Sequence, residues 1–381
     1  MTAGVVTVGA ALSLSGRFAV QGQQARRGLT LWAEDVDAAG GLAVRELGGR
    51  VTVRLLVHDD QSRTGAAAAL AERLIVDDRV DLLVGPYSSA LALAAAPVTE
   101  RHRKVLWNHG GSSNAIDDAG FRYIVNLLAP AGKYFVGLLD MVRAAAPAAR
   151  RVAILHGARG TFPRAVSAGA EAHAARVGFE LVLTASYPPT EDGFADLVAR
   201  VIASRPDVIL GVGTTDADLA FARALVAAGA RASAIGMVAA SIEHFGEVLG
   251  PTAHGFFGPS QWEPGVRHRP ELGPTSAEFV ARFRARFGAE PDYPASQAYA
   301  AGLVAQRCVE IAGTLDDDAV LGAARDLALT TFYGDFRLDP MTGRQVGHRL
   351  VVVQWHGRAR RIVWPPTVAE ARPELPPSPG R

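Results

Sequence analysis

The chain has 381 residues, 49% of them hydrophobic, which is too long for one ordinary core and suits two or three domains. A formal net charge of +1 excludes a general electrostatic attraction to nucleic acid or anionic lipid. The one cysteine, Cys308, excludes an intrachain disulfide, and no apolar run reaches the roughly 18 residues that a membrane helix needs.

The N-terminal residues do not have the pattern of a secretory signal. Met1 is followed almost at once by a predicted strand over residues 5–9, with no basic region ahead of it. Two interpretations stay open: a signal has been removed and a start methionine added, or the protein is cytosolic.

Strand and helix patterns alternate along the first third of the chain, as in parallel sheets covered by helices. The helix at 23–39, for example, places Leu29, Trp32 and Val36 on one face and ends at two glycines. The predicted strands are 5–8, 51–57, 81–84, 105–108 and 123–126, and the predicted helices are 23–39, 66–78 and 88–102.

A second series of the same kind follows, about the size of one more domain. Its predicted strands are 151–156, 180–184, 207–212 and 234–237, and its helices are 133–146, 163–177, 194–204 and 217–228. The two series predict the α/β class, with two doubly wound parallel sheets.

The last third has a different organisation. A short strand is predicted at 255–258, and Thr275 to Glu278 form a capping-box pattern before a helix with phenylalanines at helical spacing. Two more helices are expected at 294–312 and 316–328, then a hairpin of strands 351–355 and 361–364. From residue 365 the chain is proline-rich and is expected to run over the surface.

Enzyme, nucleotide and metal motifs are missing or incomplete. The sequence from Gly211 to Asp216 imitates a dinucleotide fingerprint but has aspartate in place of its third glycine. There is no phosphate loop of the GxxxxGK type, no GxSxG nucleophile motif and no metal-ligand spacing among the histidines. We therefore predict no catalytic residues, no cofactor and no metal.

Two clusters of small polar residues follow neighbouring predicted strands, at 85–89 and 108–114. Open α/β sheets bind ligands at the carboxyl ends of their strands, and free N–H groups at helix N-termini can hold a carboxylate without any arginine. The alternative is that Ser88, Ser89 and Ser113 merely cap their helices.

Five short segments, in this order, make the chain resemble a known family: GAALSLSGRFAVQG at 9–22, VGPYSS at 84–89, QWEP at 261–264, FGAEPDY at 287–293 and TFYGDF at 331–336. Nearly the whole chain resembles the substrate-binding proteins of branched-chain amino-acid-type ABC transporters, the leucine/isoleucine/valine-binding group of type I periplasmic binding proteins. A cytosolic amide-sensing regulator of the same fold is a near relative.

The resemblance implies two discontinuous lobes joined by three hinge crossovers, with the ligand between them. The first lobe is expected to hold residues 1–127 and 259–332, the second 128–258 and 333–364, and 365–381 form a C-terminal tail. The crossovers are expected near 126–130, 257–261 and 331–335.

The resemblance also implies ligand-binding residues. Ser89 and Ser113, with the N–H of Gly111, would hold a ligand carboxylate. The early loop would supply one wall residue, Phe18 or Gln21. Tyr87 is available as a further wall, and Trp107 is either a wall or a core residue because it lies within a strand. The second-lobe candidates are Thr161, Phe162, Thr214, Asp216 and Val238.

The chain departs from the family where an acid should receive the ligand's ammonium. Val238 aligns with that acid, and Asp216 or Glu243 would have to replace it. Thr214 stands where many relatives have a tyrosine, and the family's cysteine pair is replaced by Ser62 and Ser88. An ammonium facing valine would lose its hydration without a counter-charge, which favours a carboxylate without an α-amino group.

Three functions follow. The preferred one is a non-catalytic, periplasmic or extracytoplasmic receptor that closes on a small carboxylate, either an amino acid or an aromatic or branched organic acid, and delivers it to a membrane permease. The alternative is a cytosolic ligand sensor of the same fold. An enzyme on this scaffold would need a catalytic constellation that the sequence does not supply. Neither nucleic-acid binding nor membrane insertion is expected.

Overall fold

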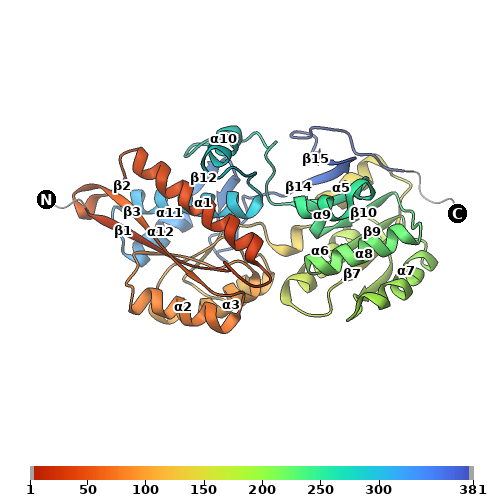
Figure 1. Cartoon of the computed structure of the whole chain (residues 1–381), viewed down its shortest axis with the longest axis horizontal. Coiled ribbons are helices and arrows are strands. Elements are labelled where there is room, and N and C mark those ends of the chain that lie inside the picture. The colour runs from red at the N-terminus through yellow and green to blue at the C-terminus, as the bar shows by residue number, and fades with distance from the viewer. Residues whose placement is uncertain (1–3, 377–381) are drawn as a thin grey trace. The chain divides into compact units, whose positions relative to one another are not determined.

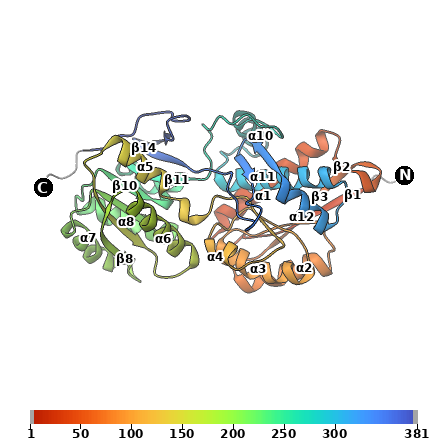
Figure 2. The ribbon, with the colours of Figure 1, turned by 180° about the vertical axis from the view of Figure 1, so that it is seen from behind.

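The computed structural model describes residues 4–376, which divide into two compact units. The first unit holds the chain up to Ala129 together with Val266–Arg349, and the second holds Pro130–Gly265 and the chain from Leu350 onward. Figures 1 and 2 show the helices and strands of each unit from opposite sides. Between residues 4 and 376, no helix is both long enough and apolar enough to cross a membrane.

All three chain crossings lie after the bounds that we predicted, the first by only two residues and the other two by more. Residues 259–265 stay in the second unit, because β11 (Phe256–Ser260) continues its pairing with β14 (Val351–His356) and Gln261 Nε2 donates to Tyr134 Oη. Residues 333–349 stay in the first unit, because β13 (Gly334–Arg337) pairs antiparallel with β12 (Ala328–Thr331). Both departures arise from contacts that lie after the crossings expected from the resemblance.

The first unit is built on a six-stranded sheet in the order β2-β3-β1-β4-β5-β6, parallel except for the β2–β3 pair. Its helices cover both faces, with α2 and α3 on one side and α1, α10, α11 and α12 on the other (Figure 1). The strands are β1 (Val5–Leu12), β2 (Leu42–Val44), β3 (Gly49–Asp59), β4 (Leu82–Val84), β5 (Leu106–Asn108) and β6 (Ile124–Asn126). The helices are α1 (Ala19–Ala38), α2 (Thr64–Val76), α3 (Ser89–His102), α4 (Asn114–Asp118), α10 (Ser276–Phe287), α11 (Tyr293–Ala312) and α12 (Asp317–Asp326).

The long helices α1 and α11 pack closely because a glycine lies at their crossing. A Cβ at Gly28 would lie 2.1 Å from the carbonyl oxygen of Ala295, so only glycine fits without a backbone shift. The Trp32 side chain is buried and its Nε1 donates to Gln306 Oε1 at 3.3 Å. This packing fixes the N-terminus of α11 beside the sheet.

The second unit has a seven-stranded sheet in the order β15-β14-β11-β10-β9-β7-β8. Its two faces follow the alternation of strand side chains: Val152 and Ile154 pack with α5 and α6, and Ala153 and Leu155 with α7, α8 and α9. The strands not yet given are β7 (Arg151–His156), β8 (Glu180–Ser186), β9 (Val208–Val212), β10 (Ala234–Met237) and β15 (Ala359–Trp364). The helices are α5 (Val136–Ala145), α6 (Thr161–Arg176), α7 (Phe194–Ala203), α8 (Thr215–Ala227) and α9 (Glu243–Leu249).

The described part of the C-terminal tail, which we expect to run over the surface, is docked on the second unit. Gln354 Nε2 donates to the Glu374 carbonyl at 2.8 Å, and Glu374 N donates back to Gln354 Oε1 at 2.8 Å. Ala371 and Leu375 pack against the same apolar core as α5 and α6. These apolar contacts, together with the two hydrogen bonds to Gln354, hold the described part of the tail against the second unit.

Candidate functional site

The first unit has a topological switch point beside β1, where the strand order continues to β3 on one side and to β4 on the other. Ligands of open α/β sheets bind outside the carboxyl ends of strands at such points. The loops after β1 and β4 meet there, and the rings of Phe18 and Tyr87 pack edge to face with centroids 5.6 Å apart. Both rings are only partly buried, so this edge presents an aromatic surface.

Tyr293 completes this aromatic cluster, although the sequence analysis gave it no role. It is the first residue of α11, and its hydroxyl is hydrogen-bonded to that of Tyr87. The two tyrosines are 206 positions apart in the chain. The only sequence signal was the FGAEPDY segment, which carried the resemblance without indicating a contact.

Ser89 lies between the loops that follow β4 and β5. Its Oγ accepts hydrogen bonds from the backbone N–H groups of Ser112 at 3.1 Å and Ser113 at 3.0 Å. A hydroxyl oxygen has two acceptor positions and one donor hydrogen, so these two bonds leave the Ser89 hydroxyl hydrogen to be donated. The preceding Ser88 has a φ of 123° and its side chain does not cap α3.

The N–H of Gly111 is already engaged, which corrects the role we predicted for it. It donates to Asn108 Oδ1 at 2.8 Å, because the fully buried Asn108 side chain folds back under the loop. Ser113 Oγ accepts from Ala115 N at 3.3 Å and thus caps α4, as the alternative interpretation of this serine expected. Burial lowers the pKa of His109 to about 4, so this loop residue is neutral.

Gln21 lies in the first turns of α1, three residues after Phe18. It is half-buried, and its Oε1 is buried without a hydrogen-bond partner in the part of the chain that the structure describes. A buried amide oxygen without a donor is uncommon, so Gln21 is a further polar group that a ligand or a water molecule would satisfy.

The candidate residues of the second unit lie in the loops and helix starts that follow the carboxyl ends of its strands. Thr161 and Phe162 begin α6 after β7, and Thr214 and Asp216 lie at the start of α8 after the neighbouring β9. Phe162 packs edge to face with Tyr134, with centroids 5.1 Å apart. Thr214 is exposed and caps α8 through Ala217 N.

The apolar and acidic candidates of the second unit differ in their surroundings. Val238 follows β10 and is half-buried against the core. Asp216 is exposed in the first turn of α8, and Glu243 pairs with Arg360 at 3.3 Å.

A buried carboxylate that sequence reasoning missed is Asp218, two residues after Asp216. It is 1% exposed and accepts hydrogen bonds from Tyr187 Oη at 2.9 Å and from Ala239 N at 3.0 Å. Burial raises the pKa of Asp218 to about 7. Ala239 directly follows Val238, so this hydrogen bond links the start of α8, where Asp218 lies, to the segment after β10.

Comparison with known proteins decides the family. The model of the periplasmic binding protein family matches residues 5–360. The chain belongs to this family. A curated relative, "Leu/Ile/Val-binding protein homolog 8" of Brucella abortus, is 25% identical over 296 residues, which cover 75% of this chain and 71% of the relative.

Solved structures show the same type I fold for this periplasmic binding protein. The branched-chain amino acid transporter substrate-binding protein LivJ of Streptococcus pneumoniae, solved with isoleucine, has a TM-score of 0.78 at 16% identity, over 94% of this chain and 98% of LivJ. A solute-binding protein of Rhodopseudomonas palustris, solved with 3,4-dihydroxybenzoic acid, has a TM-score of 0.75 at 19% identity, over 99% of each chain.

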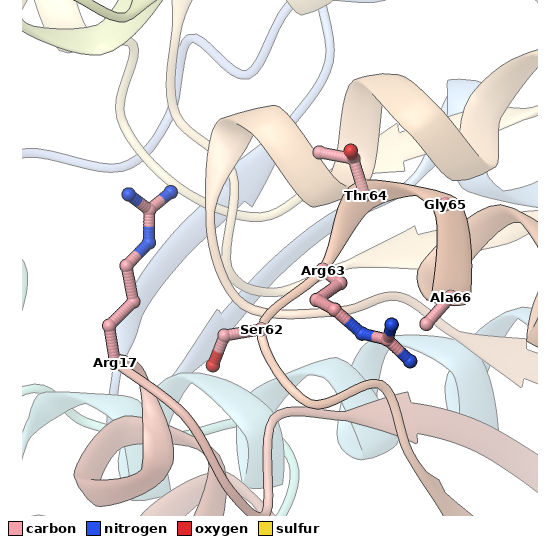
Figure 3. A pocket seen from close by; sticks show the side chains of 6 residues that line it. All are labelled: Arg17, Ser62, Arg63, Thr64, Gly65 and Ala66. Atoms are coloured by element: carbon pink, nitrogen blue, oxygen red, sulfur yellow. The ribbon is translucent and has the colours of Figure 1, made fainter.

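One cavity of this periplasmic binding protein, of about 620 Å³, lies within the first unit beside the loop after β1. Figure 3 shows Arg17 on one side and the start of α2 on the other, with the two arginine side chains extending in different directions. The lining residues are Arg17, Ser62, Arg63, Thr64, Gly65 and Ala66. None is a predicted site residue, although Ser62 Oγ accepts from Phe18 N at 3.1 Å. In residues 4–376, no group of three or more His, Cys, Asp or Glu side chains could hold a metal ion.

Proposed function

We propose that this chain is the extracytoplasmic receptor of an ABC importer, which closes its two units on a small carboxylate and delivers it to a membrane permease. The observation that carries the proposal is Ser89, whose oxygen accepts from Ser112 N and Ser113 N and whose hydroxyl hydrogen finds no acceptor among residues 4–376. A carboxylate oxygen is the natural acceptor for that hydrogen.

The surroundings of Ser89 favour an anion without a basic side chain. The first N–H groups of the 14-residue helix α3 have no partners within the helix, and Ser88 does not cap them. Together with the positive end of the helix dipole, they attract negative charge. The neighbouring aromatic rings would pack against the apolar body of the ligand.

The second unit supports one ligand class over the other, because the position predicted for the acid that would receive an α-ammonium holds Val238. Val238 is apolar, Glu243 is paired with Arg360, and both Asp218 oxygens accept hydrogen bonds from the protein. We therefore favour an aromatic or branched carboxylate over an α-amino acid. The structural neighbours include one protein solved with isoleucine and one solved with a dihydroxybenzoic acid, so this fold accommodates both classes.

The receptor is expected to release its ligand unchanged. The candidate site residues include no nucleophile paired with a base, and the one histidine in the loop after β5 is buried and neutral. Conversion of the bound compound over hours, in proportion to protein concentration, would contradict this part of the proposal.

A thermal-shift screen tests the ligand class. The panel is leucine, isoleucine and valine against 4-hydroxybenzoate, 3,4-dihydroxybenzoate and 4-methyl-2-oxopentanoate, and we expect larger stabilisation by a member of the second group. A ligand at 100 times its Kd stabilises the folded state by about 2.7 kcal/mol.

Strong stabilisation by the amino acids that is lost in Asp216→Asn would show that Asp216 supplies the counter-charge and that the ligand class is wrong. Mass spectrometry of any small molecule that co-purifies with the protein extends the search beyond the panel. A co-purifying ligand without any acidic group would contradict the carboxylate site itself.

A further inference from the structure

A chain of buried polar side chains begins under the loop that follows β5. Asn108 is completely buried, and its Oδ1 accepts from Gly110 N at 3.2 Å and Gly111 N at 2.8 Å. Its Nδ2 donates to the Gly111 carbonyl at 2.7 Å and to Asn126 Oδ1 at 2.6 Å. These four bonds use the whole hydrogen-bonding capacity of the amide. Asn108 thus holds the backbone at Gly110 and Gly111, while Ser89 binds the next two N–H groups, of Ser112 and Ser113.

The same series of polar side chains continues across the sheet to Asp117 in α4 and to Arg344. Asn126 is the register partner of Asn108 in the β5–β6 ladder, and its Nδ2 donates to Asp117 Oδ1 at 2.8 Å. The Asp117 side chain is 8% exposed and lies 3.8 Å from Arg344 Nε. Arg344 also pairs with Asp118, which is 61% exposed and has no bond to Asn126.

Arg344 belongs to the last stretch of the first unit, close to where the chain leaves it. The next residue, Gln345, donates from Nε2 to the Leu127 carbonyl at 3.2 Å and accepts through Oε1 from Gly347 N at 2.8 Å. Leu127 lies two residues before the first crossing at Ala129, and Gln345 lies four residues before the third at Arg349. The series of buried polar side chains therefore ends at two of the three segments through which the polypeptide leaves this unit.

We propose that Asn108 and Asn126 are positioning residues that hold the loop over residues 110–113 in the conformation in which its N–H groups orient the anion-binding Ser89, anchored through Asp117 to the segment that carries Arg344 and Gln345. The ligand-binding consequence rests on the proposed function, because it requires Ser89, which this loop orients, to receive the carboxylate. The positioning itself does not, because the hydrogen bonds are present without a ligand.

Two neighbouring aspartates provide a matched test. Asp117→Ala removes the acceptor of Asn126, whereas Asp118→Ala removes only an exposed partner of Arg344. In Asp117→Ala we expect the Gly110 and Gly111 amide hydrogens to exchange about five- to tenfold faster, as for the loss of one buried hydrogen bond. In Asp118→Ala, exchange of these amides should stay within twofold of the wild-type rate.

A third variant separates positioning from charge. Asp117→Asn keeps an oxygen acceptor for Asn126 but loses the negative charge beside Arg344, so it should restore slow exchange at Gly110 and Gly111. Exchange of core amides in β1 and β4 gives the reference for global destabilisation. If Asp117→Ala accelerated those core amides equally, or behaved like Asp118→Ala, the positioning role would be wrong. If Asp117→Ala does not fold, Asn126→Ala breaks the same link and is measured against Asp118→Ala in the same way.

Binding of two probes, 4-hydroxybenzoate and L-isoleucine, is measured by calorimetry on the same variants. Whichever probe binds the wild type should bind Asp117→Ala about five- to tenfold more weakly, with Asp118→Ala unchanged. Equal affinity in Asp117→Ala and the wild type would overturn the link to binding. If neither probe bound the wild type, the ligand class of the proposed function would be in question, and the exchange data would still decide whether the residues position the loop.

Discussion

Ser88 and Ser89 are adjacent hydroxyls in different environments. Ser89 Oγ accepts two backbone hydrogen bonds from the neighbouring loop, whereas Ser88 Oγ is buried and has no hydrogen-bond partner among the described residues 4–376. The Ser88 φ of 123° lies in a region that side chains rarely adopt, and strained residues of this kind cluster at ligand sites. The pair allows the contribution of one hydroxyl to be compared with that of its neighbour.

We predict that Ser89→Ala lowers the free energy of unfolding by about 1–3 kcal/mol, because it removes the acceptor of two buried N–H groups. Ser88→Ala is the control and should cost little, because its hydroxyl bonds nothing. Urea denaturation of both variants measures the difference. Equal losses in the two variants would mean that the hydrogen bonds of Ser89 contribute nothing specific to stability.

Calorimetry should also show that Ser89→Ala weakens ligand binding by about 1.5–3 kcal/mol, as for the loss of a hydrogen bond to a charged group.

Asp218 gives the second unit a pH-dependent stability. Its pKa is raised by burial to about 7, compared with 3.8 in an unperturbed aspartate. The folded state therefore binds this proton more tightly than the unfolded state, and the stability contributed by the protonated form is lost as the pH rises from about 4 to about 7. The hydrogen bonds from Tyr187 Oη and Ala239 N stabilise the ionised carboxylate, so they limit how far burial raises the pKa and how much stability is lost.

Asp218→Asn should remove this part of the pH dependence. Between pH 4 and pH 7, we expect the free energy of unfolding to fall less steeply in Asp218→Asn than in the wild type, whatever the offset between the two proteins. Chemical denaturation at four pH values measures the slopes, with Asp216→Asn as the exposed control. Parallel slopes for Asp218→Asn and the wild type would show that Asp218 does not titrate in this range.

At the scale of elements, the contact between α1 and α11 determines where the aromatic cluster forms. The N-terminal residue of α11, Tyr293, reaches Tyr87, and the loop before α1 carries Phe18. Gly28 sets the separation of the two helices, because a Cβ there would overlap the Ala295 carbonyl. A shift of α11 would therefore move Tyr293 as well as loosen the core.

We predict that Gly28→Ala destabilises the protein by about 1–3 kcal/mol, the usual cost of overpacking a tight contact. The control is Gly322→Ala in α12, where a Cβ would meet nothing within 4 Å. That exposed helical position should instead gain up to about 1 kcal/mol from the better helix propensity of alanine. Thermal denaturation that moved both variants in the same direction would contradict the close helix contact.

At the scale of the whole molecule, the proposed function requires the two units to close on the ligand. We predict that small-angle scattering shows a smaller radius of gyration with a saturating amount of the carboxylate that gives the largest thermal shift. Ser89→Ala at the same ligand concentration is the control and should remain less compact. An unchanged scattering profile for the wild type at saturation would count against closure.

The sequence by itself determined the α/β class, most of the strands and helices, and the loops at the strand ends. These features depend on local patterns: runs of buried apolar residues, helical spacing as in Leu29, Trp32 and Val36, and turn residues between them. The capping box from Thr275 to Glu278 was also predicted, because both hydrogen bonds form within one helical turn.

Only the tertiary structure decided which residues meet. Tyr293 joins Tyr87 across 206 positions, Asp218 rather than Asp216 is the buried acid of α8, and the Gly111 N–H points to Asn108. The assignment of residues 333–349 to the first unit likewise depends on the pairing of β12 with β13. Local periodicity specifies which face of an element is apolar, whereas the direction of a loop N–H and the partner of a buried polar group are set by packing between distant segments.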